Sequence, residues 1–307
     1  MTSAQRFWWR TALELKLRKN PGDAFQDFFS TVMAKAYGSD FVRVRPFGQL
    51  GDKGCDGYLV SSGRVFQCYG ALNSENNKVA YLIGKMKEDH AKAAKAMKTV
   101  MKEWCMVHNF VDGLPIEAVE TLSALQKNNE KQALGFFGME SFESTIFALD
   151  DAKIEDLLGI AATASDALNL QITELRDLVN SVELAAMDVV TVQVQPVPVD
   201  KLVFNKLPLH WAKLIEFGWG NAPLVAEYLA NRPEPLIAEQ LAEHFRNRYA
   251  YLKTEGLAPG AIMSSLYEMV TGTGNVTPQR QIAAQALLAF LFESCDIFED
   301  HPTEVTQ

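Results

Sequence analysis

The stretch "GDKGCDGYLVSSGRVFQCYG", residues 51–70, holds the side chains of this sequence that are best suited to chemistry. Asp56 lies at the tip of a glycine-rich turn, where we expect an exposed carboxylate that binds a hard divalent cation through oxygen. The glycines around it allow a tight backbone bend and the close approach of a substrate. The alternative is an ordinary β-turn, in which aspartate and glycine are common for local reasons.

Gln67 follows in "RVFQCY", which has the pattern of a strand. If "YLVSSGRVFQC" forms a hairpin, residues 56 and 67 lie near each other at its open end. The amide oxygen of Gln67 and the backbone carbonyl of Cys68 are neutral donors that, with Asp56 and water, complete the shell of Mg²⁺ or Mn²⁺. Such an ion serves phosphodiester hydrolysis, because it polarises a phosphoryl oxygen and lowers the pKa of a bound water. The alternative is a buried strand glutamine bonded to backbone.

The order helix, strand, "GDKGCDGY", strand and "VFQCY" resembles the PD-(D/E)XK nuclease superfamily of restriction-endonuclease-like folds. Within that superfamily it is most similar to the Mrr-type variant, whose second motif is Q-x-K. The resemblance covers roughly residues 20–110 and implies metal ligands at Asp56 and Gln67. It also implies a ligand from the preceding helix at Gln26, with Asp27 as the competing position. The implied activity is a Mg²⁺- or Mn²⁺-dependent endonuclease acting on DNA.

The sequence departs from the family pattern at Tyr69, where the superfamily has a lysine that orients water and neutralises charge at the phosphate. In some members the lysine comes from the following helix. Lys78, Lys85 and Lys92 are seven residues apart in that helix and share one stripe. Lys85 is the expected catalytic lysine because it lies in mid-helix. The alternative is that all three are solvated surface residues and that catalysis is impaired.

The elements that must position these residues alternate between helical and strand patterns. We expect a helix over 22–38, a strand at "FVRVRPF", a hairpin turning at Ser61–Gly63, a long helix within 75–102, a strand at "EWCMVHN", a helix over 115–127, a strand at "QALGFFG" and a helix over 139–148. Strands separated by helices of this length imply a mixed sheet covered by helices. The expected fold is an α/β domain over 1–150, an acidic helical and linker segment over 151–200, and an all-α domain over 201–307.

The last predicted helix, "PQRQIAAQALLAFLFESCDIF", is apolar around most of its circumference. A helix of this kind is buried on several sides, within its own bundle or against another chain. We expect it to leave an exposed apolar strip, bordered by the acidic "ESCDIFEDHPTE", that docks a partner. Residues 201–307 are therefore predicted to drive association, with a second copy or with another protein.

The wider sequence has its own resemblance. "QCYG" after the glycine-rich turn, "VHNFVDGLP" and the ending "FLFESCDIFED" resemble nuclease components of bacterial antiviral operons, among which ABC-three-component systems are the nearest group. This resemblance implies that an ABC-type ATPase partner controls the nuclease.

Composition limits the alternatives. The chain has 307 residues, four scattered cysteines and a formal net charge of −9. No apolar stretch is long enough for a membrane span, and no CxxC pair is present, so a cytoplasmic protein with reduced thiols is expected. A negative protein meets nucleic acid through a local basic patch or through a partner. The second hypothesis is therefore a catalytically impaired nuclease-fold adaptor that acts through protein–protein assembly.

Two further segments admit two interpretations each. "RFWWRTALELKLRK" either contacts phosphates and bases or, as we favour, is a docking helix that packs Phe7, Trp8 and Leu13 onto the α/β domain. In "VHNFVDGLP", Asn109 and Asp112 either line the cleft or, as we favour, cap the next helix and hold its preceding turn.

Overall fold

The structure is a computed structural model, and it describes residues 1–44, 53–71, 79–183, 201–233, 236–272, 276–294 and 297–299. The chain forms two compact units. One, the sheet unit, is Ala12–Leu158; the other, the helical unit, combines Met1–Thr11 with Gly159–Gln307. The first helix, α1 (Ser3–Lys19), contributes residues to both units.

The sheet unit is built on a mixed five-stranded sheet in the order β1-β2-β3-β4-β5. The strands are β1 (Phe41–Arg43), β2 (Gly57–Leu59), β3 (Arg64–Tyr69), β4 (Glu103–His108) and β5 (Ala133–Phe137). β1, β2 and β3 pair antiparallel, whereas β3, β4 and β5 pair parallel. The predicted hairpin is confirmed, with Gly63 at a φ of 68° in its turn. The end of the predicted strand at 45–47 and the turn residues Gly51 and Asp52 lie outside the described residues.

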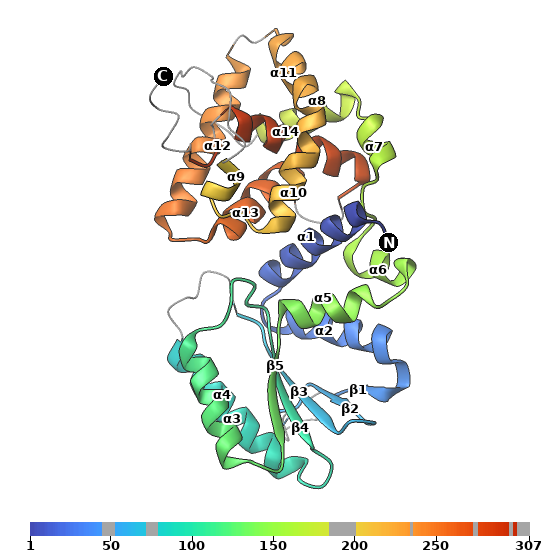
Figure 1. Ribbon diagram of the computed structural model, residues 1–307, viewed down its shortest axis with the longest axis vertical. Helices are drawn as coiled ribbons and strands as arrows, with labels where there is room; N and C mark the ends of the chain where they lie inside the picture. Colours follow the sequence, from blue (N-terminus) through green and yellow to red (C-terminus); the bar gives the residue numbers. More distant parts are fainter. Residues whose placement is uncertain are drawn as a thin grey trace. The chain divides into compact units, whose positions relative to one another are not determined.

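Helices cover both faces of this sheet, as the sequence predicts. They are α2 (Gly22–Tyr37), α3 (Val79–Ala96), α4 (Ile116–Asn128) and α5 (Met139–Phe147), and α6 (Asp151–Leu158) ends the unit. On one face Phe29 of α2 packs against Phe66 and Phe137 of the strands. On the other, Val65 and Trp104 share a buried cluster with Met86 of α3. Residues 65 and 66 point to opposite faces, as successive strand residues do. α3 and α4 lie side by side (Figure 1).

The helical unit contains, besides the start of α1, a bundle whose members are α7 (Ala164–Leu168), α8 (Ile172–Glu183), α9 (Lys201–Phe204), α10 (Leu209–Gly218), α11 (Ala222–Ala230), α12 (Ile237–Thr254), α13 (Pro259–Thr271) and α14 (Pro278–Glu293). Thr277 caps α14 by accepting a hydrogen bond from the N–H of Arg280, directly before the first residue of the predicted last helix. The end of the predicted helical and linker segment, residues 184–200, lies outside the described residues. No described helix has both the length and the apolar character needed to cross a membrane.

α14 is the central helix of the bundle and packs against α8, α10, α11 and α13. From Gln281 to Phe292 it is buried at every residue except Phe290, which is half-buried. The expected exposed strip along this helix is therefore wrong, because its own unit covers the apolar circumference. Association through residues 201–307 remains a prediction, without α14 as its surface.

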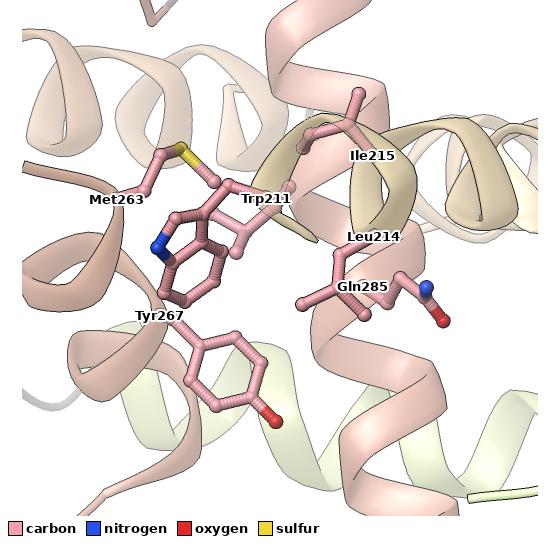
Figure 2. A pocket seen from close by; sticks show the side chains of 7 residues that line it. Trp211, Leu214, Ile215, Met263, Tyr267 and Gln285 are labelled. Atoms are coloured by element: carbon pink, nitrogen blue, oxygen red, sulfur yellow. The ribbon is translucent and has the colours of Figure 1, made fainter. Parts of the chain in front are cut away.

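A small cavity lies where α10, α13 and α14 meet. Trp211, Leu214, Met263 and Tyr267 line it, and Figure 2 shows the Trp211 indole and the Tyr267 ring pointing into the same space. Its volume of about 10 Å³ is room for roughly one water molecule. The buried Gln285 Nε2 beside it has no hydrogen-bond partner among the described residues. This cavity is a core feature of the bundle and is too small for a ligand.

Candidate functional site

Asp56 lies between α2 and β3, immediately before β2. Its Oδ1 accepts a hydrogen bond from Gln26 Nε2 at 2.6 Å, and its Oδ2 accepts one from the backbone N–H of Cys68 at 2.7 Å. Only 4% of the residue is exposed. The expectation of an exposed turn carboxylate is therefore wrong: the backbone N–H of Asp56 bonds to Phe66 O, which draws the residue onto the edge of the hairpin.

Of the two predicted α2 positions, Gln26 is the one in contact with Asp56. Asp27 instead forms an ion pair with Arg43 of β1. The one-turn periodicity of α2 explains the difference, because Phe25 and Phe29 fix the buried face and Gln26 lies beside it. The resemblance thus selected a residue that the structure brings to Asp56.

Gln67 is next to this contact. It lies one residue beyond the registered pair Gly57↔Phe66, between the two β3 residues whose backbones bond to Asp56. The residue is 6% exposed, and its Oε1 has no hydrogen-bond partner within the described part of the chain. Leaving a buried amide oxygen without a donor costs about 1–3 kcal/mol. This oxygen is therefore available to accept a hydrogen bond from a ligand or to coordinate a cation. That Asp56 and Gln67 share one ion remains a prediction.

The glycine-rich loop also packs tightly on α3. Gly54 has a φ of 75°, and a Cβ built there would lie 2.3 Å from the backbone oxygen of Asp89. Only glycine allows both this conformation and this approach. The next residue, Cys55, joins the buried cluster with Leu82 and Met86 of α3. The loop that presents Asp56 is thereby fixed against the helix that carries the predicted lysine.

Lys85 is held by a carboxylate of its own helix. Its Nζ lies 3.1 Å from Asp89 Oδ2, and Asp89 is 5% exposed at its side chain. Burial opposes the charged lysine, but the hydrogen bond and the charge of Asp89 raise the pKa of Lys85 above its ordinary value, so the ammonium persists. Lys92 pairs with Glu88 at 2.6 Å. Lys78 lies outside the described residues.

Asp89 is a residue that the sequence interpretation missed. The available signal was its spacing of four residues from Lys85 and three from Lys92, which places all three on one side of a helix. Its burial was not readable from the sequence, since burial depends on tertiary contacts such as the approach of Gly54 to the Asp89 backbone.

Tyr69, at the position of the family lysine, belongs to a row of aromatic rings. Its ring is stacked on Phe110 with centroids 6.0 Å apart and lies 6.3 Å from the ring of Tyr81 on α3. Tyr81 is 58% exposed. The residue is therefore held by packing and supplies no positive charge at the end of β3.

Cys68 contributes backbone rather than sulfur. Burial, aided by the charge of Asp56, raises the pKa of the Cys68 thiol well above its ordinary value, so the thiol is neutral. A neutral thiol is a poor metal ligand. Among the described residues no cluster of three His, Cys, Asp or Glu side chains is placed to hold an ion. The candidate donors are instead one carboxylate, two amide oxygens and one backbone carbonyl, which is a set of hard oxygen ligands.

Asn109 and Asp112 are structural residues, but neither caps α4, which begins after Pro115 without a side-chain cap. Asn109 is 1% exposed and exchanges hydrogen bonds with both backbone groups of Ala71, at 2.8 Å each, while also donating to Leu17 O. Asp112 forms a two-bond ion pair with Arg18, at 2.7 and 2.8 Å.

The N-terminal helix α1 has buried tryptophan and leucine side chains. Trp9 is 1% exposed, and its indole N–H donates to Gly159 O at 3.0 Å within the helical unit. Trp8 and Leu13 are also buried. Buried indoles are not available to stack on bases, so the packing of Trp8 and Leu13 is confirmed. The expected packing onto the α/β domain is wrong for Trp8, because residues 1–11 are grouped with the helical unit.

A recess of about 400 Å³ opens at the carboxyl ends of β4 and β5, lined by His108, Phe110, Phe136, Gly138 and Glu140 among others. Burial lowers the pKa of His108 to about 4, so its imidazole is neutral near pH 7. Phe110 belongs both to this recess and to the aromatic row of Tyr69.

Comparison with known proteins finds a family match for one part of the chain. Residues 171–299 match the family CTD10, C-terminal domain 10 of the ABC-three component (ABC-3C) systems. This segment lies within the helical unit and covers most of its bundle. The wider resemblance to ABC-three-component systems is thereby supported for that unit. No curated protein and no solved structure matches the chain.

Proposed function

We propose that this chain is a metal-dependent DNA endonuclease that acts in a bacterial antiviral system of the ABC-three-component type. The observation that carries the proposal is the contact of Asp56 with Gln26 and with the Cys68 N–H, together with Gln67, which lies between the two β3 residues that bond to Asp56 and whose Oε1 has no partner among the described residues. A restriction-endonuclease-like fold of the Mrr type, with its Q-x-K motif changed at Tyr69, accounts for this combination. The CTD10 match supports the system to which the chain is assigned.

The residues present fit Mg²⁺ or Mn²⁺. Asp56 and Gln67 would hold the ion, together with the Cys68 carbonyl and Gln26. Gln26 donates to Asp56 here through its amide nitrogen, and rotation of the amide by half a turn offers oxygen instead. A bound ion of this kind polarises a phosphoryl oxygen and lowers the pKa of a coordinated water.

The chain's own residues have distinct tasks in this proposal. Asp56 supplies the negative charge, and the Cys68 N–H fixes the orientation of its carboxylate. Lys85, whose side chain is 32% exposed, neutralises charge at the phosphate while Asp89 anchors it to α3. Tyr69 and Tyr81 supply apolar surface beside the strand end. Charge stabilisation of this type is worth about 3–4 kcal/mol in comparable enzymes, or roughly a hundredfold to a thousandfold in rate.

We assign partner binding to the helical unit. The CTD10 match and the name of its systems support control by another component, which we propose to be an ABC-type ATPase. We also assign to this unit the association with a second copy through residues 201–307. Separate units for catalysis and for control would keep a toxic nuclease inactive until its partner engages.

The decisive experiment is cleavage of duplex DNA with Mg²⁺ or Mn²⁺, with and without the proteins encoded beside this one. We expect cleavage that EDTA abolishes and that Asp56→Asn reduces by a factor of roughly a hundred or more. Glu130→Gln, an exposed carboxylate after α4, serves as the control. Cleavage by Asp56→Asn at the wild-type rate would leave Asp56 as a turn residue only.

A second candidate is an adaptor that retains the fold without catalysis. The observation that favours it is Tyr69, which occupies the lysine position and is stacked on Phe110. An adaptor binds its partner equally well after Asp56→Asn and shows no metal-dependent heat in titration calorimetry. A nuclease loses metal binding with the same substitution.

A further inference from the structure

The net charge of −9 is unevenly divided between the two units. The sheet unit has 18 Lys and Arg against 20 Asp and Glu, a formal charge of −2, whereas the rest of the chain has 11 against 18, a charge of −7. Within the sheet unit, residues 79–102 carry six lysines and two acidic residues, a charge of +4. This segment is α3 with the turn that joins it to β4.

The two acidic residues of this segment are already engaged with lysines of the same helix. Glu88 pairs with Lys92, and Asp89 pairs with Lys85. The four remaining lysines are exposed and, among the described residues, form no ion pair or side-chain hydrogen bond: Lys87, Lys95, Lys98 and Lys102. The surface therefore presents a row of uncompensated positive charges.

Lys87 and Lys95 lie on the exposed side of α3, and Lys98 and Lys102 follow in the turn after its end. Leu82, Met86 and Ala93 fix the opposite side of α3 against the sheet. Lys87 and Lys95 are eight residues apart, about 12 Å along the axis at 1.5 Å per residue. Lys98 and Lys102 add two exposed lysines before the start of β4, where the stem of Lys102 lies near Gly63 of the hairpin turn. A row of this length matches an extended polyanion better than a single small anion.

The row begins beside the candidate site. The backbone of Asp89 touches Gly54 of the loop that presents Asp56. In the first turn of α3 the exposed Tyr81 lies against Tyr69, two residues after Gln67. Protein surfaces that bind nucleic acid use this combination: lysines spaced along the phosphate backbone of the nucleic acid, and an aromatic side chain at one end of the row.

We propose that the solvent face of α3, extended by Lys98 and Lys102, binds the sugar–phosphate backbone of DNA and leads it to the site of Asp56 and Gln67. The proposal rests on the function proposed above and adds where the substrate lies. It also explains how a chain with a net charge of −9 holds a polyanion: the negative charge is concentrated in the other unit.

The test is the salt dependence of DNA binding by the full-length protein. The background is Asp56→Asn, so that cleavage does not interfere, and the probe is a labelled duplex followed by fluorescence anisotropy from about 50 to 200 mM salt. Each lost phosphate contact should reduce the slope of log K against log salt by about 0.9. We expect Lys87→Gln with Lys95→Gln to reduce it by about 2 and to weaken binding at low salt.

The matched control is Lys127→Gln with Lys131→Gln, which changes the net charge equally at two exposed positions outside α3. Its slope should equal that of the background protein. Equal losses in the two pairs would overturn the proposal, because they would show a general effect of charge. Binding of phosphatidylserine vesicles, but not of DNA, through Lys87 and Lys95 would overturn it as well.

The two proposals fail separately. If the lysine pair governs DNA binding but the wild-type protein with its partners never cleaves, the surface stands and the nuclease does not. If the protein cleaves DNA and the lysine pair changes neither slope nor affinity, the nuclease stands and the surface does not. Unchanged thermal midpoints of the exposed-lysine variants exclude a folding effect.

Discussion

At the scale of the residue, Asp56 has a structural role beside the chemical one that we propose. Its removal leaves the Gln26 amide and the Cys68 N–H without their acceptor in a site that is 4% exposed. Each unsatisfied buried donor costs about 1–3 kcal/mol. We therefore expect Asp56→Ala to lower the free energy of unfolding by about 2–6 kcal/mol, measured by denaturant titration, with a smaller loss for Asp56→Asn. A loss below about 0.5 kcal/mol would show that the carboxylate is not held as described.

The burial of His108 makes the free energy of unfolding depend on pH, and it fixes the sign of that dependence. Its folded-state pKa of about 4 lies below the ordinary 6.5, so the unfolded chain binds the proton first. Stability is therefore full above pH 6.5 and is lost as the pH falls toward 4. Over that interval the loss from this group approaches about 3 kcal/mol, at 1.36 kcal/mol per pH unit.

His108→Leu should remove this contribution. The measurement compares the free energy of unfolding at pH 7 and at pH 5 in both proteins, so that all other titrating groups cancel. We expect the variant to lose about 2 kcal/mol less than the wild type over this interval. Identical losses would mean that His108 titrates normally in the folded protein.

At the scale of the element, periodicity alone was enough for most of the fold. The alternation around Val65 and the hairpin turn at Gly63 predicted β2 and β3, and the apolar stripe through Leu82 and Met86 predicted α3. The pairing of Gln26 with Asp56 came from the family resemblance, since thirty residues of sequence separate them. The burial of Asp89 and the bonds of Asn109 depend on tertiary contacts that no local pattern carries.

A substitution at Gly54 tests whether the close packing of its loop on α3 positions the candidate site. An alanine there meets both a φ of 75° and a contact of 2.3 Å with the Asp89 backbone, whereas Gly113→Ala meets a φ of 107° with nothing within 4 Å. Strain of φ costs on the order of 1–2 kcal/mol at either position. We expect Gly54→Ala to be destabilised more than Gly113→Ala in thermal unfolding, and to lose metal binding. Equal destabilisation would show that the close approach to α3 contributes nothing.

At the scale of the whole molecule, the two units separate the two proposed tasks. The candidate site and the basic face of α3 lie in the sheet unit, while the CTD10 match at 171–299 lies in the helical unit with most of the negative charge. The sequence placed the first 150 residues together, because nothing in the pattern of "RFWWRTALELKLRK" shows that α1 is shared. Trp9 shows that the start of α1 belongs to the helical unit, since its indole N–H donates a hydrogen bond to Gly159 of that unit.

This sharing predicts how the chain can be divided. Trp8 and Trp9, 6% and 1% exposed, are grouped with the helical unit, whereas Leu13 and Leu17 belong to the sheet unit. A fragment of residues 1–158 therefore exposes two indoles, an apolar patch of roughly 300–500 Å² that favours association. A fragment of residues 12–158 lacks them. We expect the fragment 12–158 to be folded, monomeric by light scattering and still able to bind DNA through α3 with the same salt dependence. We expect the fragment 1–158 to self-associate and to show red-shifted tryptophan emission. Two equally monomeric fragments would show that the start of α1 needs no cover from the helical unit.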